Sequence, residues 1–186
     1  MNLVDLQMNL SLRSKNGLAF LLSGIVVWII ITIIYVLPIE LKFQNIFMLS
    51  VTALLFPLAV FISKIINADW KSKDNPLGTL GLYLNLAQVM YFPLIFWALF
   101  NSPEEMVSFF AIIAGAHFFP FGWLYRANAY YLLAPIMSVL IFVISAFVHT
   151  HFLWHIPLTM VLLLTTLVVL LHVDYKRKLV FQKENH

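Results

Sequence analysis

Cysteine is absent from this chain of 186 residues, and charged side chains are scarce. The lack of cysteine excludes disulfides, thiolate metal sites and a cysteine nucleophile. Only 10% of the residues are charged and 62% are hydrophobic, whereas soluble domains carry about 25% charged residues. A soluble chain of this length could not cover so much apolar surface with polar groups. The sequence therefore predicts that a lipid bilayer surrounds most of the protein.

Six apolar segments are long enough to cross a membrane, which requires roughly 20 mostly apolar residues. They predict an all-α, polytopic membrane helix bundle that forms one integral membrane domain over residues 1–186. Only Arg126–Asn128 separates the fourth segment from the fifth, but a fused helix would be too long for one span and would place a charge in lipid. We therefore expect a tight hairpin there. The predicted spans are 18–38, 46–66, 77–100, 106–125, 129–148 and 156–173.

Motifs that mark common catalytic sites are missing as well. The chain has no G-x-S-x-G nucleophile motif, no glycine-rich phosphate loop and no H-E-x-x-H zinc motif. No acidic residue falls inside a predicted span, so a relay of buried carboxylates is excluded. These absences favour a protein that is not an enzyme, and they predict no cofactor.

The basic residues predict the orientation of the bundle. The formal net charge is +3. If the N-terminus lies in the cytoplasm, ten of the eleven Lys and Arg residues are cytoplasmic, and Lys42 is the exception. This asymmetry is typical of membrane proteins, whose cytoplasmic loops are enriched in Lys and Arg. We therefore expect two cytoplasmic termini, a basic cytoplasmic tail over 174–186 and no nucleic-acid partner.

Two polar segments are predicted to lie at the cytoplasmic membrane surface. In residues 1–16, apolar residues recur at three- and four-residue spacing, which predicts a short amphipathic helix at the interface; a frayed tail is the alternative. In the loop ADWKSKDNPLG, 68–78, Trp70 beside two lysines indicates an interface anchor, and a regulatory or partner-binding segment is the alternative. Asn75–Pro76 predicts the start of the third span.

Prolines interrupt four of the predicted spans. A proline inside a helix removes a backbone hydrogen bond and kinks the axis. Four kinked helices favour a bundle that encloses a ligand or that moves, although proline is also common in membrane helices for packing alone. The four steps are Phe56-Pro57, Phe92-Pro93, Phe119-Pro120 and Ala134-Pro135.

Four polar residues in the third and fourth spans form the candidate ligand-binding site. Asn85, Gln88 and Tyr91 follow one another at three-residue spacing, and His117 lies in the aromatic stretch GAHFFPFGWLY. Polar side chains within a membrane usually face the bundle interior. They predict a cavity between the two spans. Hydrogen bonding between helices is the alternative, since a buried neutral imidazole can donate and accept at once.

The run HTHFLWH before the last span is a weak metal-binding candidate. His151 and His155 are four residues apart and could share a helix face, as metal-binding histidines do, but no glutamate base accompanies them. An ordinary loop with interfacial histidines is the alternative interpretation.

Three segments resemble a family of small, uncharacterised bacterial integral membrane proteins that carries a domain-of-unknown-function label. They are SLRSKNG (11–17), ADWKSKDNPLGTLGLYLN (68–85) and GAHFFPFGW (115–123). The resemblance covers nearly the whole chain. It implies a bacterial plasma membrane and about six helices, and it brings no activity, ligand or catalytic residue.

These observations leave three hypotheses for function. The leading one is a multi-pass plasma-membrane protein that binds or passes a small molecule or lipid through a cavity at the third and fourth spans. The second is a non-catalytic structural or partner subunit, or an immunity-type protein, without a cavity. The third is an intramembrane enzyme. Glycine- and alanine-rich helix faces are compatible with a homo-oligomer and do not require one.

Overall fold

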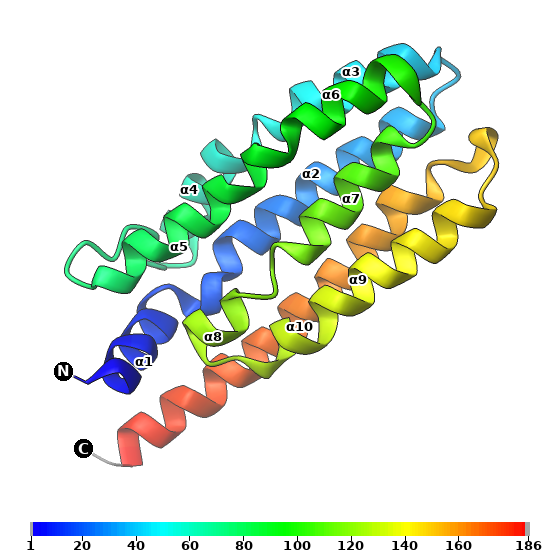
Figure 1. The fold of residues 1–186 in the computed structure, drawn as a ribbon. Helices are drawn as coiled ribbons and strands as arrows, with labels where there is room; N and C mark the ends of the chain where they lie inside the picture. Colours follow the sequence, from blue (N-terminus) through cyan, green and yellow to red (C-terminus); the bar gives the residue numbers. More distant parts are fainter. Residues whose placement is uncertain (1, 185–186) are drawn as a thin grey trace.

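The computed structural model describes residues 2–184, and within this range the chain folds into helices joined by short connections, without a β-strand (Figure 1). Both ends of the chain lie at one end of the bundle, here called the terminal end; the opposite end is the distal end. In chain order the helices are α1 (Leu3–Arg13), η1 (Lys15–Gly17), α2 (Leu18–Val36), α3 (Leu41–Thr52), α4 (Leu55–Ile65), α5 (Pro76–Ala87), η2 (Gln88–Tyr91), α6 (Phe92–Asn101), α7 (Met106–Ala116), α8 (Phe121–Tyr125), α9 (Asn128–Phe147), η3 (Thr150–Phe152) and α10 (His155–Glu184).

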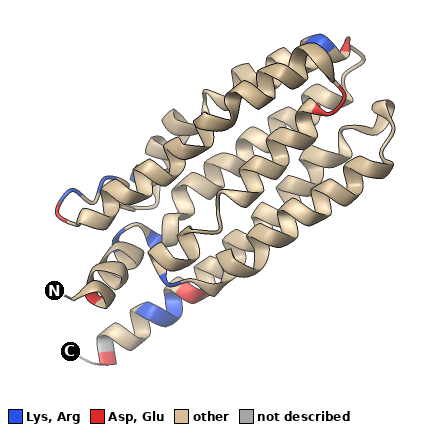
Figure 2. Cartoon of the chain, in the orientation of Figure 1, with Lys and Arg blue, Asp and Glu red and all other residues tan. Residues whose placement is uncertain are grey.

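The helices have the length and composition of membrane spans. Five helical segments of the described chain pass this test, and a sixth does if α3 and α4 are counted as one bent span. Charged residues lie at the two ends of the bundle, and the stretch between them is free of charge (Figure 2). This arrangement is the one expected of a membrane helix bundle, because burying a charge in lipid is costly. The five segments are Lys15–Val36, Pro76–Asn101, Met106–Tyr125, Asn128–Phe147 and Thr150–Gln182.

The core lies along α2 and α10, which pack against each other. Helix α4 packs on another side of α2, while α9 packs against both α10 and α7. Ile31, Met137 and Leu167 are fully buried where these helices meet. The α5–α6 span is peripheral, and only 11% of its apolar window is buried. Its main contacts are with α1, α7 and α8.

Prolines interrupt three of the four helices in which the sequence places them. Pro57 cannot bond to the carbonyl of Ala53, four residues earlier, and α3 and α4 meet at a 41° bend at this point. Pro93 and Pro120 likewise follow the 3₁₀ turn η2 and the break between α7 and α8. Only α9 continues through its proline, Pro135.

Helix α1 forms where the amphipathic pattern predicts a helix, and it packs on the protein as well as facing outward. A capping box between Asn2 and Asp5 starts it. One face is exposed, but Gln7, Leu10 and Ser11 are buried. The Gln7 side chain donates a hydrogen bond to the carbonyl of Trp123 at α8 (2.8 Å). Helix α1 is therefore part of the bundle rather than a separate surface helix.

A left-handed turn at Lys15–Gly17 connects α1 to α2. All three residues have positive φ, between 52° and 78°, and a Cβ at Gly17 would lie 3.0 Å from the Tyr125 ring. Glycine is therefore required at this position, because the backbone is left-handed and the space is already filled. The turn directs the Asn16 side chain into the bundle, where it is fully buried.

Asn16 and Lys178 connect this turn to the last helix. The Asn16 amide nitrogen donates to the Leu171 carbonyl and to the Asp174 carboxylate. Its oxygen accepts from Ser11 and from the Lys178 ammonium. Lys178, whose side chain is only 10% exposed, pairs with Asp174 as well. These bonds hold α10 in place past Val173, where the predicted span ends, and the helix continues to Glu184.

We expect Asn16→Ala to destabilise the protein by about 2–4 kcal/mol, because it leaves several buried polar groups without partners. Equilibrium unfolding in mixed micelles measures this change. Asn101→Ala is the matched control, since Asn101 is exposed and bonds only within its own helix. Equal stability of the two variants would contradict the role of Asn16.

Candidate functional site

A cavity of about 340 Å³ lies at the terminal end of the bundle. Its walls come from α1 and η1, the start of α2, the α4–α5 connection, α5, and the region of α8 and the start of α9. Segments far apart in the sequence thus meet around one space. The volume falls within the range of small-molecule sites, about 300–1,000 Å³.

Aromatic rings form the inner wall of the cavity. Phe118, Phe121, Tyr125 and Tyr130 pack with ring centroids 5.8–6.3 Å apart, and all four line the cavity together with Phe20. The Tyr130 hydroxyl donates to the carbonyl of Asn16 (2.7 Å), which fixes the ring against the left-handed turn. The inner wall therefore presents mainly ring faces and edges to a ligand.

Glycines keep the cavity open at α5. A Cβ on Gly78 would lie 2.9 Å from the Ser72 carbonyl, and one on Gly81 would lie 3.1 Å from the Leu124 side chain. Both residues line the cavity. Because neither has a side chain, α5 approaches the loop and α8 closely without filling the space between them.

The rim of the cavity belongs to the loop before α5. Trp70 packs edge-on against Phe56 at 5.4 Å, and the Lys71 ammonium lies 4.8 Å from the centre of the Trp70 ring. Lys71 and Lys73 both line the cavity, both are exposed, and neither forms an ion pair within residues 2–184. The rim thus carries two cations that can accept an anionic partner.

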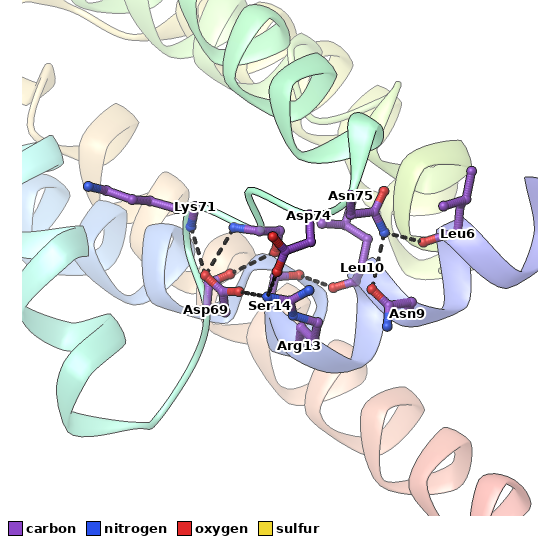
Figure 3. A network of polar contacts seen from close by, with 10 residues as sticks. Leu6, Asn9, Leu10, Arg13, Ser14, Asp69, Lys71, Asp74 and Asn75 are labelled. Carbon is purple, nitrogen blue, oxygen red and sulfur yellow. Dashed lines mark hydrogen bonds and ion pairs between the residues drawn. The ribbon is translucent and has the colours of Figure 1, made fainter. Parts of the chain in front are cut away.

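Helix α1 fastens this loop in place (Figure 3). Arg13 forms an ion pair with Asp69 and lies 3.7 Å from Asp74. The Asn75 amide donates to the Leu6 carbonyl at 2.8 Å, and its oxygen caps α5 by accepting from the N–H of Leu77. One side chain therefore starts α5 and attaches it to α1, so the start of the span is set as the Asn75–Pro76 pair predicts.

Asp69 is the charged centre of the loop. Its partial burial acts to raise the pKa, but hydrogen bonds from the Ser72 N–H, the Arg13 guanidinium and the Lys71 N–H outweigh this and lower the pKa of Asp69 below its usual value. The carboxylate is therefore ionised at neutral pH and organises the turn.

The structure separates the four residues of the predicted cavity. Asn85 lines the observed cavity, and its side chain donates to the Gly81 carbonyl of its own helix (3.0 Å). Gln88 and Tyr91 are not among the lining residues, and Tyr91 is 55% exposed. They lie in η2, beyond the point at which the cavity ends along α5, since Asn85 is the last residue of this span that lines it.

His117 lies behind the aromatic wall instead of in the cavity. Its Nδ1 is 2.6 Å from the Ala114 carbonyl, and its ring lies 4.1 Å from Phe118 and 6.0 Å from Phe121. It sits where α7 ends before Pro120, and it bonds a carbonyl of the last helical turn. In this structure His117 supports two rings that face the cavity.

His151 and His155 lie around the start of α10. His155 makes a hydrogen bond with the Phe152 carbonyl and stacks on Trp154, with ring centroids 3.7 Å apart. Among the described residues, no group of three or more His, Cys, Asp or Glu side chains is arranged to hold a metal ion. Metal binding by this pair stays a prediction that would need ligands from elsewhere.

Most of the cavity leaves no recognisable pattern in the sequence. Trp70 and its neighbouring lysines carry a visible signal, but that signal indicates an interface anchor as readily as a ligand site. In GAHFFPFGWLY, the ionisable ring of His117 is the residue that suggests a site, but Phe118 and Phe121 are the residues that line the cavity. Gly17 could have been recognised from the pair Asn16–Gly17, since both residues tolerate a left-handed turn.

Comparison with known protein families matches residues 3–174 to a family of unknown function, DUF7010. The chain belongs to this family. The match agrees with the resemblance to an uncharacterised family that three segments of the sequence carry. No curated protein and no solved structure matches the chain.

We expect acid to weaken the attachment of the loop to α1. Because folding lowers the pKa of Asp69, its stabilising effect is complete above the unfolded-state pKa, near 4, and is lost as pH falls through the folded-state value. Thermal unfolding should therefore show wild type more stable than Asp69→Asn at pH 7, with the difference shrinking below about pH 4. Asp74→Asn, at the exposed partner of Arg13, should have a smaller effect; a constant difference across pH would refute the assignment.

Proposed function

We propose that this protein is a multi-pass protein of the bacterial plasma membrane that binds a small amphiphile with an anionic head in the cavity at its terminal end. The observation that supports this proposal most is the combination of an aromatic inner wall with two cations at the rim, Lys71 and Lys73, that form no ion pair within residues 2–184. The cavity occupies one end of the bundle, which supports binding of the ligand more than its passage across the membrane.

The inner wall supports an apolar part of the ligand. Rings and small apolar residues make up most of the lining, and such surfaces gain from removing hydrocarbon from water. Asn85 and Thr79 are the polar residues on the α5 side, and they can orient a polar group near the middle of the ligand. A fully hydrophilic metabolite would lose its hydration against this wall without recovering enough hydrogen bonds.

The rim supports an anionic head. Arg13 already pairs with Asp69, so the charge of Arg13 is satisfied within the protein. Lys71 and Lys73 remain, and each offers three donors to a carboxylate or phosphate. Both stand on a loop that α1 holds rigidly, which reduces the entropy cost of binding.

The distribution of cations supports an orientation with the terminal end in the cytoplasm. Arg and Lys residues cluster at that end, while the distal end carries Lys42 and the acidic residues Glu40, Glu104 and Glu105 (Figure 2). On this orientation the cavity would take its ligand from the cytoplasm or from the cytoplasmic leaflet.

A second candidate function is that of a structural or partner subunit, and the α5–α6 span favours it. Trp97 and Phe100 are among the exposed aromatic side chains of this span, and very little of it is covered by the bundle. Lipid covers such a surface adequately, and so would a helix of another protein or of a second copy. The geometry of residues 2–184 offers no arrangement that favours an intramembrane enzyme.

We expect the double variant Lys71→Ala/Lys73→Ala to bind an anionic amphiphile at least tenfold more weakly than wild type, because the head loses two charge-assisted contacts. Titration with a fluorescent fatty acid in nonionic detergent measures the affinity. Lys64→Ala is the matched control: Lys64 is an exposed cation at the same end that does not line the cavity.

A second variant tests the inner wall. Thr79 is exposed and lines the cavity, so Thr79→Phe should fill part of the space without disturbing the core, and it should weaken binding of the same probe. Undiminished binding by both variants would reject the cavity as the site, and loss of binding by Lys64→Ala alone would point to nonspecific attraction.

Single-cysteine labelling tests the orientation, because the chain contains no cysteine of its own. We expect a membrane-impermeant maleimide to label Glu40→Cys in intact cells and to label Lys73→Cys only after the cells are opened. The reverse pattern would place the cavity on the outer side of the membrane.

A further inference from the structure

A second cavity, of about 430 Å³, lies at the distal end of the bundle. It is bounded by the α6–α7 connection with the first turn of α7, the last turn of α9, and the α9–α10 connection. Its lining is polar and includes Glu104, Glu105, Ser108, His149 and His151. None of these residues belongs to the cavity at the terminal end.

Hydrogen-bond acceptors predominate in this distal cavity. The carboxylates of Glu104 and Glu105 can only accept, and each neutral imidazole offers one accepting nitrogen. Neither glutamate forms an ion pair within the described chain. Among the described residues, no Lys, Arg, Asn or Gln lines the cavity. The two glutamates precede the first turn of α7, whose dipole stabilises negative charge there.

Ser108 is an independent sign that a partner is missing. It is 98% buried, and its Oγ has no hydrogen-bond partner among the described residues. A buried hydroxyl without a partner is costly, so native structures nearly always supply one. Ser145, on the opposite wall, differs because it donates to the Phe142 carbonyl (2.9 Å). Thr150, the third hydroxyl of the lining, is exposed, so Ser108 is the buried lining hydroxyl that lacks a partner among the described residues.

The acidic side of the cavity is held in place by a buried amide. Asn45 is fully buried, accepts from the Tyr35 hydroxyl, and donates to the carbonyl of Pro103 at 2.8 Å. Pro103 directly precedes Glu104. The backbone that presents the two carboxylates is thus anchored to α2 and α3, which makes the cavity a built feature of the fold.

We propose that the distal cavity binds an organic ammonium group, carried either by a small soluble amine or by the head of an ethanolamine lipid. An ammonium supplies positive charge and three donors, which complement two unpaired carboxylates and the unsatisfied Ser108 hydroxyl. The cavity is too large for one bare ion. In residues 2–184 no cluster of three or more metal-ligating side chains exists to hold a metal. This inference does not rest on the proposed function of the terminal cavity.

Titration calorimetry tests the soluble source. It measures the binding of ethanolamine to the protein in nonionic detergent. We expect saturable binding that the double variant Glu104→Gln/Glu105→Gln weakens at least tenfold and that Ser108→Ala weakens by less. Glu40→Gln is the matched control, because Glu40 is an exposed carboxylate at the same end that does not line the cavity; it should bind as wild type does.

Reconstitution into bilayers of mixed phosphatidylethanolamine and phosphatidylcholine tests the lipid source. Native mass spectrometry should then show preferential retention of phosphatidylethanolamine, which the double glutamine variant removes. Retention without ethanolamine binding identifies the lipid head, and ethanolamine binding without retention identifies a soluble amine; both outcomes support the ammonium site.

Three outcomes would overturn the proposal. One is absence of both effects in wild-type protein. Another is that tetramethylammonium, which has the charge but no N–H donors, binds to the cavity as tightly as ethanolamine does. The third is equal weakening by Glu40→Gln and by the double variant. Equilibrium unfolding in mixed micelles checks that each variant is folded, and this check is independent of any ligand of the terminal cavity.

Discussion

The buried amide of Asn16 is the interaction on which the terminal end of the molecule depends. It sits at the centre of three consecutive left-handed residues, and its bonds reach α1, α10 and, through its carbonyl, Tyr130 of α9. A left-handed turn of this kind has no value by itself, since each non-glycine residue in it carries a conformational cost. The cost is offset because the turn places one fully satisfied polar group where four segments meet.

The apolar surroundings explain why such interactions gather at the ends of the bundle. Between the ends, each backbone polar group must be satisfied within the protein, which favours unbroken helices and apolar side chains. A polar side chain between the ends bonds to backbone: Ser23 of α2 donates to the Leu55 carbonyl at the start of α4 (2.6 Å). The two cavities described above, and the polar networks beside them, lie at these polar ends.

Length, hydropathy and the positions of proline predict the helical class and the helix start at Pro76. Of the six predicted spans, five correspond to single helical segments, and the sixth corresponds to the bent pair α3–α4. These features are local, so the residues that cause them are adjacent in the chain. The cavity is different, because its wall combines Gly17, Gly81 and Phe121, which come together only through packing. Spacing places Gln88 and Tyr91 on the same face as Asn85, but the cavity ends at Asn85 along this span, and spacing does not show how far a cavity extends. The burial of Lys178 could not be predicted either. A lysine in a basic segment is expected to be solvated, and its buried partners come from distant parts of the chain.

The length of α10 has a mechanical consequence. Its 30 residues extend about 45 Å at 1.5 Å per residue, which exceeds the roughly 30 Å hydrocarbon layer of a bilayer. The turns after Val173 therefore extend past the apolar layer on the side of the terminal cavity. The same rigid rod carries Lys178, which contacts Asn16 and the Tyr125 carbonyl in the cavity wall. Because the exposed turns and Lys178 belong to one continuous helix, a force applied to those turns would act directly on the wall of the terminal cavity.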